Sequence, residues 1–352
     1  MRGFFFLIGL AVYLSSAEAA LVKEAVSYEH EGAKLEGYRL ERIAYNALPG
    51  TFTPDFWAHQ YDQQTNQVLC TVAKRNWSSN GDHANIFGLE PNYGCCTANL
   101  HQGWPKFVSH LWMASSENGL AAVAYGPCVV DATVGDGVRT RIFVETDYPF
   151  NETVALRMEP EEPVEFPLAL RIPGWAEGAT IRTGDEEHPG TPETFFNVER
   201  VWSPGDRVEI RFPMKVRSEK RYNDAVTLLR GPVVYSLRIG EYFHRIAGEA
   251  PHADWEVYPT TDWNYGLVLD PKRPDSSIQV SVNEISKVPF SNEAAPVTLQ
   301  VKGKRIPHWF LKDNSADEPP SSPVRVEGES VPIELIPYGC ARLRITEFPV
   351  VK

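Results

Sequence analysis

Short runs of alternating apolar and polar residues, separated by turn residues, dominate the chain after residue 118. Residues 207–212 alternate strictly, and the apolar residues at every second position from Phe166 to Ile172 share one face of an extended segment. Turn residues such as Ser203-Pro204-Gly205-Asp206 separate these runs at the spacing of a strand plus a turn. This pattern is typical of an antiparallel sandwich and predicts a mainly β fold.

A second β unit is expected to begin near residue 218. We expect its strands at residues 226–229, 233–239, 278–282, 297–301 and 342–346. The Pro-rich stretch 318–323 reads as an extended connection between strands. We therefore predict two antiparallel β-sandwich domains, a middle domain at 111–217 and a C-terminal domain at 218–352.

The chain has a different character before residue 110. Residues 25–48 carry apolar residues at helical spacing, and Pro49-Gly50 stops the pattern. Residues 50–105 are rich in Asn, Gly, Pro and aromatic residues without a clear period. We predict a helix followed by a long loop, and loops of this composition often line sites.

Composition and the N-terminus limit the class of protein. The formal charge of −12 over 352 residues argues against a nucleic-acid partner, which would require a basic face. Residues 1–19 read as a secretory signal, with Arg2, an apolar core and the small-x-small site Ala17-Glu18-Ala19. The same residues also suit a buried helix of a chain that starts further upstream. The apolar run is too short for a stable membrane span, so we expect a secreted protein.

Cys95 and Cys96 are the best candidates for chemistry. Two adjacent sulfurs after Gly94, at the edge of a segment dense in Trp, His and Asn, suit a shared metal or reaction centre. The alternative is two small buried side chains, because free cysteine packs like a compact hydrophobe. The other cysteines, Cys70, Cys128 and Cys340, are too few and too scattered for a disulfide scaffold, and we expect Cys128 and Cys340 in the core.

Several longer runs are shared with one family of enzymes. They are Leu40-Glu41-Arg42-Ile43-Ala44-Tyr45-Asn46-Ala47-Leu48-Pro49, residues 57–67, residues 94–107, residues 166–175 and Arg230-Gly231-Pro232-Val233-Val234-Tyr235. On these runs the chain resembles glycoside hydrolase family 127 (GH127), which contains the β-L-arabinofuranosidases. The resemblance covers most of residues 35–240, and its matches follow the family's order.

The resemblance implies an (α/α)6 barrel that carries the active site, followed by β-sandwich domains. On that match residues 20–110 are the C-terminal remnant of the barrel with the Cys-Cys loop, and most of the barrel is missing. The resemblance also implies a zinc ion held by one Glu and three Cys. Cys95 then takes the place of the nucleophile and of one zinc ligand, and Cys96 of a second ligand.

The family's Glu-x-Cys ligand pair and its acid/base Glu have no counterpart here, so the zinc site is expected to be incomplete. Cys70 and Glu90 offer an alternative pair of ligands that the family pattern does not support. We consider substrate contacts at His59, Asn99, His101, Gln102 and Trp104, each with a structural role as its alternative. The same two interpretations apply to His83, Trp57, Trp77 and Trp112.

Three hypotheses follow for the function. The first is a secreted, glycosidase-like protein of carbohydrate metabolism that lacks hydrolytic activity, with an arabinose-containing glycan as its partner by analogy. The second is a non-catalytic β-sandwich module that binds carbohydrate or braces another domain. The third is a truncated or misassembled gene model of a full enzyme.

Overall fold

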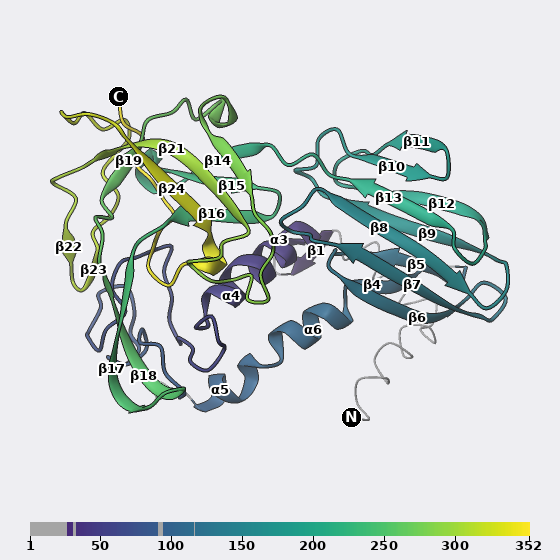
Figure 1. Ribbon diagram of the computed structural model, residues 1–352, viewed down its shortest axis with the longest axis horizontal. Helices are drawn as coiled ribbons and strands as arrows, with labels where there is room; N and C mark the ends of the chain where they lie inside the picture. The colour runs from purple at the N-terminus through teal and green to yellow at the C-terminus, as the bar shows by residue number, and fades with distance from the viewer. Residues whose placement is uncertain (1–26, 31–32, 91–93, 116) are drawn as a thin grey trace. The chain divides into compact units, whose positions relative to one another are not determined.

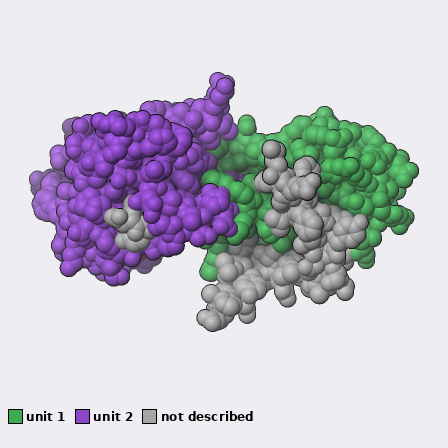
Figure 2. Space-filling view, turned by 90° about the horizontal axis from the view of Figure 1, so that it is seen from below, with its two compact units in different colours: residues 1–43, 103–214 green, residues 44–102, 215–352 purple. Residues whose placement is uncertain are grey.

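Each half of the molecule is built from two stretches that are far apart in the sequence. The computed structural model describes residues 27–30, 33–90, 94–115 and 117–352. They fall into two compact units, unit 1 with Met1–Ile43 and Gly103–Met214, and unit 2 with Ala44–Gln102 and Lys215–Lys352 (Figure 2). The predicted signal segment 1–19 lies outside the described residues, and the boundaries after residues 110 and 217 stay predictions.

Two larger sheets form the sandwich of unit 1 (Figure 1). The first has the order β11 (Glu186–Pro189), β10 (Thr180–Thr183), β13 (Arg207–Arg211), β8 (Thr153–Pro160), β7 (Val138–Thr146) and β6 (Cys128–Val134). The second has the order β12 (Thr194–Trp202), β9 (Val164–Ile172), β5 (Gly119–Ala122) and β4 (Trp112–Ser115). All neighbouring strands are antiparallel except β5 and β9, which pair in parallel.

The two sheets of unit 1 share a core made by alternation along the strands. In β8 every second residue is buried, and the same holds for β13. Ile181 of the first sheet and Ile172 of the second both lie about 3 Å from the place that a side chain on Gly190 would occupy. Trp202 is fully buried, and its indole N–H donates to the carbonyl of Phe166 at 3.1 Å. The predicted strands at 166–172 and 207–212 and the mainly β fold are confirmed.

The predicted helix at 25–48 is wrong in its first half. Strands β1 (Ser27–His30) and β2 (Ala33–Glu36) form an antiparallel hairpin there. The helical part comprises α3 (Gly37–Arg42), a π-helical stretch η1 (Ile43–Ala47) and α4 (Leu48–Gly50), and it ends at the expected Pro49-Gly50. Apolar residues in a short segment satisfy a helix and a strand equally, so periodicity alone misassigned the hairpin.

Unit 2 is organised around one antiparallel sheet. Its order is β14 (Val216–Lys220), β15 (Val226–Arg230), β16 (Val233–Leu237), β24 (Val331–Pro337), β21 (Val297–Arg305) and β19 (Tyr265–Leu267), with β20 (Gln279–Val282) also paired to β21. Smaller pairs are β17 (Glu241–Glu249) with β18 (His252–Pro259), and β22 (Leu311–Lys312) with β23 (Ser315–Ala316). The strand expected at 342–346 is reduced to β25 (Arg344–Ile345), which pairs with β3 (Asn66–Gln67). Short 3-10 turns lie at Tyr222–Asp224, Pro274–Ser277 and Tyr338–Cys340.

Residues 51–90, which we call the irregular segment, have almost no regular structure, as predicted. Backbone bridges nevertheless hold this segment against β18: Cys70 exchanges two hydrogen bonds with Val257 (3.0 and 2.8 Å), and Phe87 exchanges two with Trp255 (3.0 and 2.7 Å). The pairing satisfies backbone groups that burial would otherwise leave without partners. The irregular segment is therefore a fixed part of unit 2.

The predicted loop is wrong beyond residue 93, where two short helices follow. They are α5 (Gly94–Leu100) and α6 (Gly103–Ser109). Pro105 lies in the first turn of α6, where a helix does not need the missing backbone N–H. The glycines and the proline that suggested a loop instead mark the starts of the two helices. Over the described residues, no helix has the length and apolar character needed to cross a membrane.

Candidate functional site

Cys95 and Cys96 lie in the first turn of α5, on a helix rather than on the predicted loop. Their sulfur atoms are 3.5 Å apart. This is far longer than the roughly 2.05 Å of a disulfide bond, so both are free thiols. Cys95 is exposed and Cys96 is half-buried, which contradicts the alternative of two small core side chains.

Tyr61 of the irregular segment completes the immediate surroundings of the thiols. Its side chain hydrogen-bonds to Cys96, and the charge of a Cys96 thiolate raises the pKa of Tyr61. The hydrogen bond between the two cysteines in turn raises the pKa of Cys96. In this environment Cys96 holds its proton at neutral pH. Tyr61 was not predicted as a site residue, although it belongs to the run 57–67 that carries the resemblance.

His59 connects the irregular segment to α5. Its Nε2 lies 3.1 Å from the hydroxyl of Thr97, and its backbone exchanges two hydrogen bonds with Gly88 (2.9 and 3.0 Å). The side chain is buried, and burial lowers the pKa of His59, so the ring is neutral near pH 7. These contacts give His59 a role in positioning the helix that carries the thiols.

Asn99 and Gln102 have their polar groups engaged within their own chain segment. The Asn99 amide donates to the carbonyl of Cys95 at 2.6 Å, and its oxygen accepts from the Gln102 amide at 2.9 Å. They thus hold α5 and the turn after it. His101 is exposed at the end of α5, whereas Trp104 belongs to unit 1, where it packs against Phe107 with ring centroids 6.1 Å apart.

The two thiols fit half of a zinc site. A separation of 3.5 Å suits two sulfurs on one tetrahedral Zn²⁺ with Zn–S bonds of about 2.3 Å. Among the described residues, however, no group of three or more His, Cys, Asp or Glu side chains could hold a metal. Glu90 places its carboxylate beside Gly94, but it does not complete such a group. The described residues therefore do not fit a complete zinc site.

Cys70 is not the missing ligand. It is fully buried, and its sulfur accepts from the Gln60 amide at 3.3 Å. Burial raises the pKa of Cys70 to about 12, and among the described residues Cys70 belongs to no group of three or more His, Cys, Asp or Glu side chains that could hold a metal. Burial also raises the pKa of Cys340 to about 12 and that of Cys128 to about 11. Cys340 lies in the core as predicted, and Cys128 is half-buried on β6.

The other aromatic candidates are spread over the molecule. Trp57 is 47% exposed and meets the ring of His252 edge-on, with centroids 4.5 Å apart. Trp112 is buried on β4, and His83 is exposed. The indole of Trp77 donates to the hydroxyl of Ser315 at 2.8 Å. The structure thus gathers His59, Tyr61, Cys95 and Cys96, and it does not add these tryptophans to them.

Comparison with known protein families identifies the sandwich of unit 1. Residues 119–214 match the model of the middle domain of the GH127 β-L-arabinofuranosidases. This segment runs from the first residue of β5 to the end of unit 1. A search of curated proteins finds no match.

Solved structures with the same fold are larger than this chain. A glycoside hydrolase matches with a TM-score of 0.62 and 18% identity over 90% of this chain and 48% of its own. The GH127 β-L-arabinofuranosidase of Geobacillus stearothermophilus T6 matches with a TM-score of 0.59 and 23% identity over 90% and 46%. A GH127 β-arabinofuranosidase matches with a TM-score of 0.60 and 17% identity over 89% and 45%. The chain spans about half the length of each of these structures.

Proposed function

Because the chain is GH127-like, with the GH127 middle domain at residues 119–214, we propose that it is a carbohydrate-active protein in which Cys95 occupies the place of a glycosidase nucleophile. The observation that carries this proposal is the pair of free thiols 3.5 Å apart on α5, with Cys95 exposed. A reactive cysteine must be accessible and must lie in surroundings that can stabilise its thiolate.

Each neighbour of Cys95 has a part in this proposal. Cys95 would attack the anomeric carbon of a glycoside, forming a C–S bond as the C–O bond to the leaving group breaks. The leaving oxygen needs a proton from an acid, and water later displaces the sulfur with retention of configuration. Cys96 would be the second zinc ligand. Tyr61 restrains Cys96, and His59 holds α5 through Thr97.

We further propose that the 352-residue chain by itself hydrolyses β-L-arabinofuranosides no faster than background. The support is the count of ligands: two thiols supply two of the four donors that a tetrahedral zinc needs, and no third joins them among the described residues. The stabilisation of a Cys95 thiolate is therefore incomplete. Zinc, the sugar and the linkage belong to this proposal by analogy with the family.

A second candidate function is a non-catalytic module that binds carbohydrate. The observation that favours it is the same shortage of ligands, together with two β-rich units that do not need the thiols for their packing. This candidate predicts glycan binding that is indifferent to Cys95→Ala and to chelators. Loss of binding on removal of zinc would contradict it.

The test is hydrolysis of p-nitrophenyl β-L-arabinofuranoside by the full chain, with and without added zinc. We expect release of nitrophenol at the rate of the buffer blank for the wild-type chain and for Cys95→Ser. In parallel, zinc binding measured by competition with a chromophoric chelator should weaken in Cys95→Ser and in Cys96→Ser. Cys128→Ser, which alters a half-buried thiol of unit 1, is the matched control and should bind zinc like the wild type.

The outcomes separate the two parts of the proposal. Turnover that Cys95→Ser abolishes would contradict the expected inactivity and would retain Cys95 as the nucleophile. Turnover that survives Cys95→Ser would contradict both parts. Zinc binding that is unchanged in both cysteine variants would contradict the assignment of the pair as metal ligands.

A further inference from the structure

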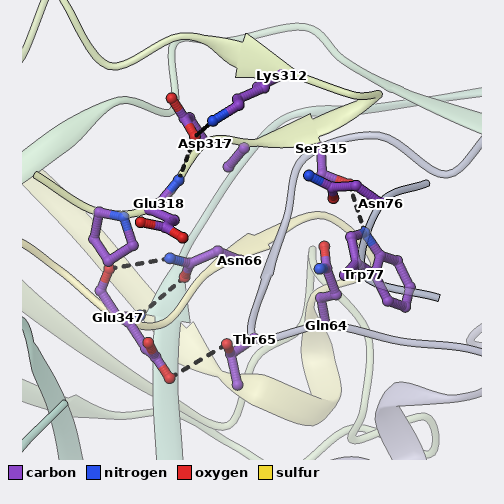
Figure 3. Close-up of a pocket in the computed structure, with 12 residues that line it drawn as sticks. Gln64, Thr65, Asn66, Asn76, Trp77, Lys312, Ser315, Asp317, Glu318 and Glu347 are labelled. Atoms are coloured by element: carbon purple, nitrogen blue, oxygen red, sulfur yellow. Dashed lines mark hydrogen bonds and ion pairs between the residues drawn. The ribbon is translucent and has the colours of Figure 1, made fainter. Parts of the chain in front are cut away.

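A polar pocket lies in unit 2, and neither Cys95 nor Cys96 is among the residues that line it. Its volume is about 510 Å³, and four stretches of chain line it: residues 64–66, residues 76–77, residues 312–319 and Glu347. Figure 3 shows their side chains arranged around one space, with Trp77 on one side and Glu347 and Glu318 on the other. Pockets that hold small ligands commonly have volumes of about 300–1,000 Å³.

Hydrogen bonds fix the walls of this pocket. The side-chain oxygen of Asn66 accepts from the backbone N–H groups of Thr346 and Glu347, each at 3.0 Å, and its amide donates to the carbonyl of Glu347 at 3.3 Å. On the other side, Trp77 is half-buried and its indole N–H is bonded to Ser315. The aromatic ring and the opposite wall therefore have set orientations, which lowers the entropy cost of binding.

Other polar groups in the pocket are available to a ligand. Across the described part of the chain, the side-chain amide of Gln64 has no hydrogen-bond partner. Among the described residues, the Glu347 carboxylate accepts one long contact, from Thr65 at 3.4 Å to one oxygen, and its second oxygen is available. An amide supplies donors and an acceptor, and a carboxylate supplies acceptors, so together they match groups that both donate and accept, such as sugar hydroxyls.

The charges in the pocket select among sugars. The lining contains three carboxylates and one cation, and that cation, Lys312, lies 3.3 Å from Asp317. Glu318 accepts from the hydroxyl of Tyr222 at 3.3 Å. The excess negative charge repels uronates and phosphates. Trp77 adds an apolar face on which a sugar ring can lie.

We propose that this pocket is a second carbohydrate site, which binds a neutral saccharide among Trp77, Gln64 and Glu347. The ring of the sugar lies on the indole, and its hydroxyls bond to the Gln64 amide and the Glu347 carboxylate. The choice of ligand class rests on the proposed carbohydrate function. The site itself does not use the thiols, so it is expected to bind sugar whether or not Cys95 reacts.

The test is calorimetric titration of the full chain with arabinobiose and arabinotriose as neutral probes. Digalacturonate and ethanolamine serve as the anionic and cationic probes. We expect millimolar or tighter binding of the neutral sugars, no binding of digalacturonate, and weaker binding of ethanolamine than of either sugar. Trp77→Ala should weaken binding by at least about tenfold, a loss of ~1.4 kcal/mol. Tyr242→Ala, which removes an exposed aromatic of the same unit outside the pocket, should bind like the wild type.

Two further variants keep the test decisive if Trp77→Ala does not fold. Trp77→Phe keeps an aromatic face and should retain most of the affinity, whereas Gln64→Ala should weaken binding severalfold. All titrations are repeated in Cys95→Ser, so that binding without turnover separates this site from the proposed nucleophile. The proposal fails if no neutral probe binds, if ethanolamine binds more tightly than the sugars, or if Trp77→Ala and Gln64→Ala both bind like the wild type.

Discussion

The sandwich of unit 1 and the irregular segment of unit 2 are stabilised in opposite ways. In the sandwich, alternation buries apolar side chains while the strands satisfy each other's backbone groups, as in β8 and β13. The irregular segment has few strand partners, and buried polar side chains bond to its backbone instead. Gln60 donates to the carbonyl of Asn85 at 2.7 Å, and Arg75 donates to that of Thr71 at 2.9 Å.

The difference shows how a chain can fix a segment that has no regular structure. A buried carbonyl without a partner costs free energy, so each one must meet a donor. In unit 2 long side chains from distant positions supply the donors. Arg344, which is fully buried, donates to the Gln63 side chain at 3.0 Å and to the carbonyl of Gly50 at 3.2 Å. The segment that carries Tyr61 and His59 is therefore held by residues near the C-terminus.

The largest effect on stability is expected at a buried ion pair in the otherwise apolar core of unit 1. Glu41 is fully buried and pairs with the buried Arg171 at 2.5 Å, and it also accepts from the backbone N–H of Tyr125 at 3.1 Å. Glu41→Ala leaves the Arg171 charge and that N–H without their acceptor. We expect a loss of about 3–5 kcal/mol in the free energy of unfolding, measured by urea denaturation.

An exposed ion pair of the same unit is the matched control. Asp131 and Arg139 lie 2.8 Å apart with side chains that are 35% and 61% exposed. Asp131→Ala should cost no more than about 1 kcal/mol, because water screens the pair. If Glu41→Ala lowered the free energy of unfolding no more than Asp131→Ala does, the expected role of the buried pair in stabilising the sandwich would be contradicted.

A smaller effect is expected in unit 2. Arg344→Met keeps most of the side-chain volume but removes the donors to Gln63 and Gly50 and the guanidinium that lies 4.2 Å from the ring centre of Tyr338. We expect a loss of about 2–3 kcal/mol, since buried acceptors lose their partners. Amide hydrogen exchange should also increase in the irregular segment before it increases in β9.

Exposed Arg325 of the same unit provides the control for that variant. Arg325→Met should leave both the unfolding free energy and the exchange pattern within error of the wild type. If Arg344→Met destabilised the chain without a local increase in exchange at residues 51–90, the arginine would stabilise the sheet and not the irregular segment.

The smallest effect concerns pH and the buried thiols. Burial raises the pKa of Cys70 from an ordinary value near 9 to about 12. The protonated thiol is the form that the fold favours, so its contribution to stability is complete below pH 9 and falls as pH rises toward 12. Between pH 9 and 10 the loss from Cys70 should be about 1 kcal/mol, because the unfolded thiol is only partly ionised at pH 9. Cys70→Ala should show a correspondingly shallower decline, and an identical slope in both proteins would contradict the shift.

Several features of the fold follow from local pattern alone. The alternation at 166–172 and 207–212 predicts β9 and β13, because a strand with one buried face carries apolar residues at every second position. Local pattern predicted the wrong structure at residues 27–36, where a hairpin replaces a helix, and at residues 94–109, where two helices replace a loop. Those segments are short, and short segments satisfy more than one period.

The candidate site was predictable only in part. The adjacent cysteines are visible in the sequence, as are the runs that connect them to GH127. Tyr61 was not predicted, because it lies 35 positions from Cys96 and reaches it only through the bridges of the irregular segment. Asn99 and Gln102 bond to Cys95 and to each other, and their contact with a sugar stays a prediction.

The sequence by itself determined that the chain is mainly β, that it resembles GH127, and that it carries a thiol pair, because strand alternation and adjacent cysteines are local properties. Only the tertiary structure decided which side chains surround that pair, that Cys70 cannot serve it, and that a polar pocket opens around Trp77. The physical reason is that these depend on contacts between residues far apart in the chain, such as Trp77 with Ser315 and Gln60 with Cys70, whose formation depends on the packing of unit 2 as a whole.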